Sequence, residues 1–123
     1  MDKSTIEAIL SGVKTIETRF SRYKIVPFGV VGVGDIVYMK PPGEEIVGQF
    51  RVKQVISFEG LDLNDLSLLK NLYEKEVGVK EDYWESKKDA KFGTLIFISA
   101  SERFITSPIK IKKSDQRGWM VLE

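Results

Sequence analysis

The chain has 123 residues, of which 42% are hydrophobic and 30% charged, and its formal net charge is +1. This balance is typical of one folded domain spanning residues 1–123 and argues against a disordered chain. The sequence contains no Cys and no His. Their absence excludes a disulfide framework, a thiol nucleophile, an imidazole base and zinc sites built from thiolates or imidazoles.

Any catalysis must therefore use Lys, Asp, Glu, Tyr, Ser or Thr side chains, or Mg²⁺ held by carboxylates. We expect neither a bound metal ion nor a cofactor. No run of 18 apolar residues occurs, so we expect no membrane partner and a cytoplasmic location. The charge is carried mostly by Lys and Glu, a usage that is typical of thermophilic organisms.

The first predicted helix lies near the N-terminus. Ser4 is followed three positions later by Glu7, which is the spacing of a capping box. Gly12 suits the left-handed residue that follows a helix. Lys14 would then lie just beyond the helix C-terminus, where the helix dipole favours a cation.

The next stretch, "KTIETRF", has the β-branched and aromatic residues and the alternation of a strand. Alternation places Glu17 and Arg19 on one face and Ile16 and Phe20 on the other. If Ile16 and Phe20 enter the core, the two charged side chains lie side by side outside it. Lys14 then lies at the entrance to this charged face.

The remaining predicted elements are five strands and two helices. Strands are predicted over 35–40 and 46–58, the second with a β-bulge at Gly48 where its alternation breaks. Helices are predicted over 62–77 and 81–88. Three further strands are predicted in the last third, over 94–104, 107–113 and 118–123. This order predicts an α+β fold, a small, partly open mixed β-barrel flanked by two or three helices.

Charge is distributed unevenly along the chain. Four cations against one carboxylate give residues 14–24 a charge of +3, and five against one give residues 103–117 a charge of +4. Residues 59–89 carry −4. If the two basic segments meet in space, they form an anion-attracting face on a nearly neutral protein.

Gly12, Lys14, Glu17 and Arg19 follow a short helix with the spacing Gly-x-Lys-x-x-Glu-x-Arg. This pattern resembles the signature of the ASCH family in the PUA-like superfamily. The segments "GVGDIVYM" and "EEIVGQFRVKQV" are similar to two further segments of that family. The resemblance implies a small β-barrel fold, a cleft lined by the motif, and RNA or a nucleotide-like ligand as the partner.

One branch of that family looks like a small amidohydrolase that acts on acetylcytidine with a Lys, a Thr and a downstream Glu. Lys14 matches the lysine of that branch. Glu17 stands at the position of the threonine, so the sequence departs from the branch there. Glu76, after the long predicted helix, matches the downstream glutamate.

Two functions therefore compete, with a purely structural role as a third reading. The first is an RNA-binding or modified-nucleoside-binding module, with Tyr23 or Trp119 available to stack a base. Its binding residues would be Lys14, Arg19, Arg22, Lys24, Lys112 and Arg117. The second is a small hydrolase, acetylcytidine amidohydrolase-like or a ribonuclease, that uses Lys14 with Glu17 or Glu76 as acid and base. In the structural reading, the charged residues are only paired surface groups.

Overall fold

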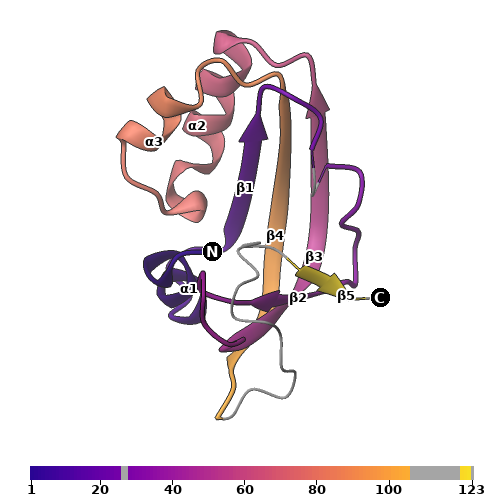
Figure 1. Ribbon diagram of the computed structural model, residues 1–123. Helices are drawn as coiled ribbons and strands as arrows, with labels where there is room; N and C mark the ends of the chain where they lie inside the picture. The colour runs from indigo at the N-terminus through magenta and orange to yellow at the C-terminus, as the bar shows by residue number, and fades with distance from the viewer. Residues whose placement is uncertain (26–27, 106–119, 123) are drawn as a thin grey trace.

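A computed structural model describes residues 1–25, 28–105 and 120–122 of the chain. Three helices and five strands occur in these residues (Figure 1). In chain order they are α1 (Lys3–Leu10), β1 (Ile16–Ser21), β2 (Ile36–Met39), β3 (Gly48–Glu59), α2 (Leu63–Val77), α3 (Asp82–Ser86), β4 (Phe92–Arg103) and β5 (Met120–Leu122). The predicted strand over 107–113 lies outside the described residues.

The strands form one sheet in the order β1-β4-β3-β2-β5. Every pairing between its described strands is antiparallel, and β1 and β5 form the two edges. The predicted α+β class is confirmed. The predicted mixed barrel is corrected to an open sheet, because all the pairings between the described strands are antiparallel and none has the parallel neighbours of a mixed sheet.

The sheet carries a hydrophobic core on each face. Adjacent residues of a strand point to opposite faces, and on β4 Leu95 belongs to one core and Ile96 to the other. The Ile96 face is covered by α1, and the Leu95 face by α2 and α3. Figure 1 shows α2 and α3 beside the upper part of β1, with α1 below them.

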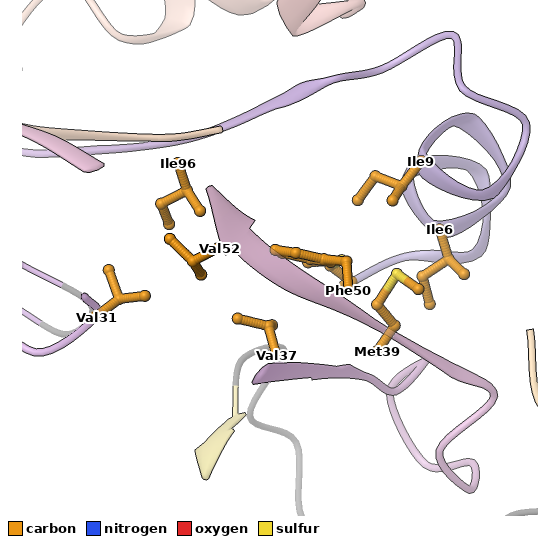
Figure 2. Close-up of a cluster of buried hydrophobic side chains, with 9 residues drawn as sticks. Ile6, Ile9, Val31, Val37, Met39, Phe50, Val52 and Ile96 are labelled. Atoms are coloured by element: carbon orange, nitrogen blue, oxygen red, sulfur yellow. The ribbon is translucent and has the colours of Figure 1, made fainter. Parts of the chain in front are cut away.

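The core under α1 is shown in Figure 2. Ile6 and Ile9 of α1 point toward Phe50 of β3 and Met39 of β2, while Ile96 of β4 lies near Val52. Burying such side chains stabilises the fold by about 1.5–3 kcal/mol each. This packing fixes α1, and with it the loop that follows, against the sheet.

The core on the other face joins α2 and α3 to β1. Ile16 and Phe20 of β1 pack with Leu66 and Leu69 of α2 and with Trp84 of α3. The ring of Phe20 lies where a side chain at residue 93 would be, so this position requires glycine: a Cβ on Gly93 would be 2.7 Å from it. The prediction that Ile16 and Phe20 enter the core is confirmed.

The ends of the helices agree in part with the sequence prediction. Gly12 has φ +83°, as predicted for the residue after α1. The N-cap of α1 is Asp2, whose carboxylate accepts from the Thr5 N–H, and not Ser4. Both residue types are good caps, and the helix begins two residues earlier than the capping-box spacing indicated.

The predicted bulge at Gly48 is also displaced. The β3–β4 register shifts between Gln49 and Arg51 and again between Val52 and Gln54. At the first shift the extra residue is on β4, where Ala100 has φ +49°. Gly48 has another purpose, since a Cβ there would be 2.5 Å from the backbone oxygen of Glu102. The glycine lets β3 and β4 approach closely.

Candidate functional site: a charged pocket at the β1 edge

Lys14 is a buried cation held at the end of a helix. Its side chain is 2% exposed. The Nζ donates a hydrogen bond to the carbonyl of Val77, the last residue of α2, and lies 3.4 Å from Glu17 Oε1. The unpaired carbonyls at a helix C-terminus favour a cation. Lys14 therefore lies at a helix C-terminus, as predicted, but the helix whose C-terminus binds the ammonium is α2 and not α1.

Glu17 joins the two cations of the motif. Its Oε2 accepts a hydrogen bond from Arg19 Nη2 at 3.1 Å, while its Oε1 faces Lys14 and accepts from the Thr18 backbone N–H. Only 7% of the Glu17 side chain is exposed, against 37% for Arg19. The predicted pairing of Glu17 and Arg19 on one face is confirmed. Glu17, however, is buried, whereas alternation alone placed it outside the core.

Burial lowers the proton affinity of Lys14. The pKa of Lys14 is lowered from its ordinary value by desolvation, and the nearby Glu17 carboxylate acts in the opposite direction. A lysine with a lowered pKa gives up its proton more readily than a solvated one. Lys14 can therefore serve as a hydrogen-bond donor or, once deprotonated, as a base.

The three residues line one pocket of about 820 Å³. This volume lies within the range typical of small-molecule sites. The pocket lies at the free edge of β1, between the N-terminal segment with α1, the segment 78–87, and the start of β4. The motif thus delivers an ammonium, a carboxylate and a guanidinium into one shared cavity.

The backbone of β1 also contributes to this edge. The carbonyls of Thr15 and Ser21 accept bonds from the β4 side, from Ile98 and Lys91 respectively. Backbone groups alternate in direction along an antiparallel strand, so those of Thr18 point to the free edge. The Thr18 N–H is already satisfied there by Glu17.

Aromatic side chains also line the pocket. Phe28 and Phe92 meet edge to face, with ring centroids 5.5 Å apart, and both line the pocket. Tyr83 also lines it, and its hydroxyl is 2.6 Å from Thr18 Oγ1. Burial raises the pKa of Tyr83 to about 12, so this phenol stays neutral at physiological pH.

The other predicted site residues do not join the three. Glu76 is exposed and is not among the residues that line the pocket. Its backbone carbonyl accepts a hydrogen bond from the Thr15 N–H, but its carboxylate does not reach the site. Arg22 and Lys24 are exposed and lie near Asp89 and Glu59, at 3.4 and 3.1 Å.

These two partners come from the acidic middle of the chain, so they offset the basic charge of residues 14–24. Lys112, Arg117 and Trp119 lie outside the described residues, and so does most of the second basic segment. Tyr23 is described and is 69% exposed, but it does not line the pocket.

Sequence reasoning missed most of the pocket residues, among them Thr94 and Asp2. Thr94 pairs with Arg19 across the β1–β4 ladder, so the two share a sheet face. Its side chain is buried, and its Oγ1 has no hydrogen-bond partner among the described residues. The sequence signal available for Thr94 was its place at the start of a predicted strand, which does not reveal a missing hydrogen bond.

Two negative observations concern the described part of the chain. No group of three or more Asp or Glu residues there lies close enough together to hold a metal ion. No helix in residues 1–25, 28–105 or 120–122 is long and apolar enough to cross a membrane.

Comparison with known proteins gives a structural likeness without a close sequence relative. No family model and no curated protein matches the sequence. The structure is similar to the crystal structure of ASCH from Zymomonas mobilis, with a TM-score of 0.64 and 16% identity over 84% of this chain. A Tyr-to-Phe and a Ser-to-Ala mutant of that protein match with a TM-score of 0.65 each, at 15% and 14% identity over the same share.

This chain spans 66–68% of the length of those three structures. The likeness therefore concerns the shared part alone. The protein has an ASCH-like fold.

Proposed function

We propose that the protein binds RNA or a modified nucleoside, and that the base enters the pocket at the β1 edge. The observation that carries this proposal is the convergence of Lys14, Glu17 and Arg19 in a pocket that aromatic side chains also line. Hydrogen-bonding groups of both kinds suit the mixed donors and acceptors of a base edge. Flat apolar walls suit the faces of its ring.

The size of the pocket supports a nucleoside-sized ligand over a long track for a polymer. A volume of about 820 Å³ holds one nucleoside with room for water. The outer cations Arg22 and Lys24 are each near a carboxylate, which weakens a continuous basic path along this side. An RNA strand would therefore present a single unstacked nucleotide to the pocket.

Fluorescence anisotropy with a labelled single-stranded RNA, competed with free nucleosides, tests the proposal. Arg19→Gln should weaken binding at least tenfold. Arg103→Gln is the matched control, because Arg103 is also partly exposed and also pairs with a glutamate, Glu7, but does not line the pocket. Absence of RNA and nucleoside binding at 50 mM salt would refute the proposal, as would equal losses for both variants.

A second function is favoured by one observation, the lowered pKa of Lys14. In this alternative the protein is a small hydrolase that uses Lys14 as base or nucleophile with Glu17, 3.4 Å away, as its acid–base partner. Glu76 is less suited to this role because its exposed carboxylate does not line the pocket. Incubation of the wild type and Lys14→Met with acetylcytidine and with RNA distinguishes catalysis from binding alone.

A further inference from the structure

Thr94 is a buried polar residue of the pocket whose hydroxyl has no hydrogen-bond partner among the described residues. The residue is 1% exposed, and its Oγ1 has no hydrogen-bond partner within residues 1–25, 28–105 and 120–122. Buried hydroxyls are nearly always hydrogen-bonded, because an unmade bond costs the full desolvation of the group. Thr94 also lines the pocket, so a bound molecule can supply the missing partner.

The position of Thr94 indicates which atom that partner presents. Thr94 lies opposite Arg19 in the β1–β4 register, so the hydroxyl and the guanidinium project from neighbouring points of one sheet face. A guanidinium only donates hydrogen bonds, and a threonine hydroxyl can donate one. Two donors side by side suit a single acceptor oxygen.

The charges around this point are of both signs. The first 19 residues contribute the side chains of Lys14, Arg19, Asp2 and Glu17 to the pocket, and Met1, whose N-terminal ammonium interacts with Arg19 and Glu17, also lines it. Glu17 lies within 3.4 Å of both cations. Because Glu17 already pairs with Lys14 and Arg19, these two cations attract an entering phosphate less than unpaired cations would.

We propose that Thr94, together with Arg19, binds a ring carbonyl oxygen of an uncharged nucleobase, and that phosphate groups stay outside the pocket. This inference rests on the proposed function and deepens it, because it identifies the selected chemical group. It makes Thr94 a specificity-determining residue. A base without a ring carbonyl offers only ring nitrogens, each with one lone pair, so no single atom of it can accept from both Thr94 and Arg19.

The test combines a ligand pair with a variant pair, measured by isothermal titration calorimetry. Inosine has a ring carbonyl and purine riboside lacks one, while uridine and cytidine extend the comparison to smaller rings. The wild type should bind at least one of the three carbonyl-bearing nucleosides tenfold or more tighter than purine riboside. Thr94→Val should remove most of that difference, and Thr94→Ser should retain it. Inorganic phosphate at 10 mM should not compete.

The free variants give a second readout that needs no ligand. Thr94→Val removes a hydroxyl without a partner, so the midpoint of thermal unfolding should stay equal or rise. Thr18→Val is the matched control, because the Thr18 hydroxyl is 2.6 Å from Tyr83 Oη and its loss should lower the midpoint. A lowered midpoint in Thr94→Val would mean that the hydroxyl has a partner in the free protein, which would overturn the inference.

The outcomes separate this inference from the function on which it rests. Wild-type protein that binds neither RNA nor any of these nucleosides refutes the proposed function and the inference together. Binding that is sensitive to Arg19→Gln but unchanged in Thr94→Val retains the proposed function and overturns the inference. Competition by inorganic phosphate overturns it too, since the acceptor oxygen would then belong to an anion.

Discussion

Replacing Glu17 with glutamine tests the physical basis of the site. Glu17→Gln keeps the shape of the side chain but removes a carboxylate that lies 3.4 Å from Lys14 and 3.1 Å from Arg19. Lys14 is 2% exposed, so water cannot solvate its ammonium in place of the lost carboxylate. Removing one partner of a buried ion pair typically costs 3–5 kcal/mol. Because glutamine retains some hydrogen bonding, we expect a loss of about 3 kcal/mol.

The matched control is Glu59→Gln. Glu59 also pairs with a lysine, at 3.1 Å from Lys24 Nζ, but both side chains are 60% exposed. Exposed pairs contribute about 0–1 kcal/mol, because water screens the charges. The two variants therefore remove the same chemical group from the same kind of pair, and they differ mainly in burial.

Urea denaturation at pH 7, followed by tryptophan fluorescence, measures both free energies of unfolding. Trp84 packs in the core that contains β1, so its emission reports on this region. A Glu17→Gln loss under about 1 kcal/mol would refute the argument that the triad is electrostatically buried. Equal losses in the two variants would also refute it, because burial would then have no effect.

Three further predictions concern proton linkage and close packing. The lowered pKa of Lys14 means that the unfolded chain binds more protons than the native protein as the pH approaches 10.5. The free energy of unfolding should therefore rise with pH toward 10.5 in the wild type and rise less in Lys14→Met, as urea titrations at several pH values would show. Tyr83 has the opposite sign: the unfolded phenol ionises near 10 and the native one at about 12, so wild-type stability should fall between these values and Tyr83→Phe should lack that fall. Gly48→Ala should cost about 2 kcal/mol or more by overpacking, because its Cβ would be 2.5 Å from the Glu102 oxygen, whereas Gly32→Ala, with its nearest atom at 3.9 Å, should change the unfolding midpoint little. A Gly48→Ala variant as stable as Gly32→Ala would mean that the strands separate easily at this point.

Local sequence rules predicted the part of the site that lies on β1 and in the turn before it. A strand has a period of two, so the spacing of Glu17 and Arg19 placed them on one sheet face, and the structure agrees. The glycine that ends α1 likewise has the predicted left-handed backbone. Both features depend on residues close together in the chain, where propensity and periodicity carry information.

The rest depends on contacts between distant residues. The carbonyl that binds Lys14 belongs to Val77, which lies 63 residues away. Thr94 reaches the pocket only because β4 pairs with β1. Glu76 looked suitable from its place near the end of a predicted helix, but the rotation of that helix directs its neighbour Val77 inward and leaves Glu76 exposed. None of these facts follows from a local pattern, since each requires the register of strands or the rotation of a packed helix.

The pocket therefore combines two kinds of polar group, and the two should respond differently to a ligand. Lys14 and Glu17 already have partners in the free protein, so they are held in place and lose little order when a ligand binds. Thr94 lacks a described partner, so its free-energy gain comes only with the ligand. Substitution of the first kind should lower stability and affinity together. Substitution of the second should lower affinity alone, and this contrast separates residues that build the pocket from those that read what enters it.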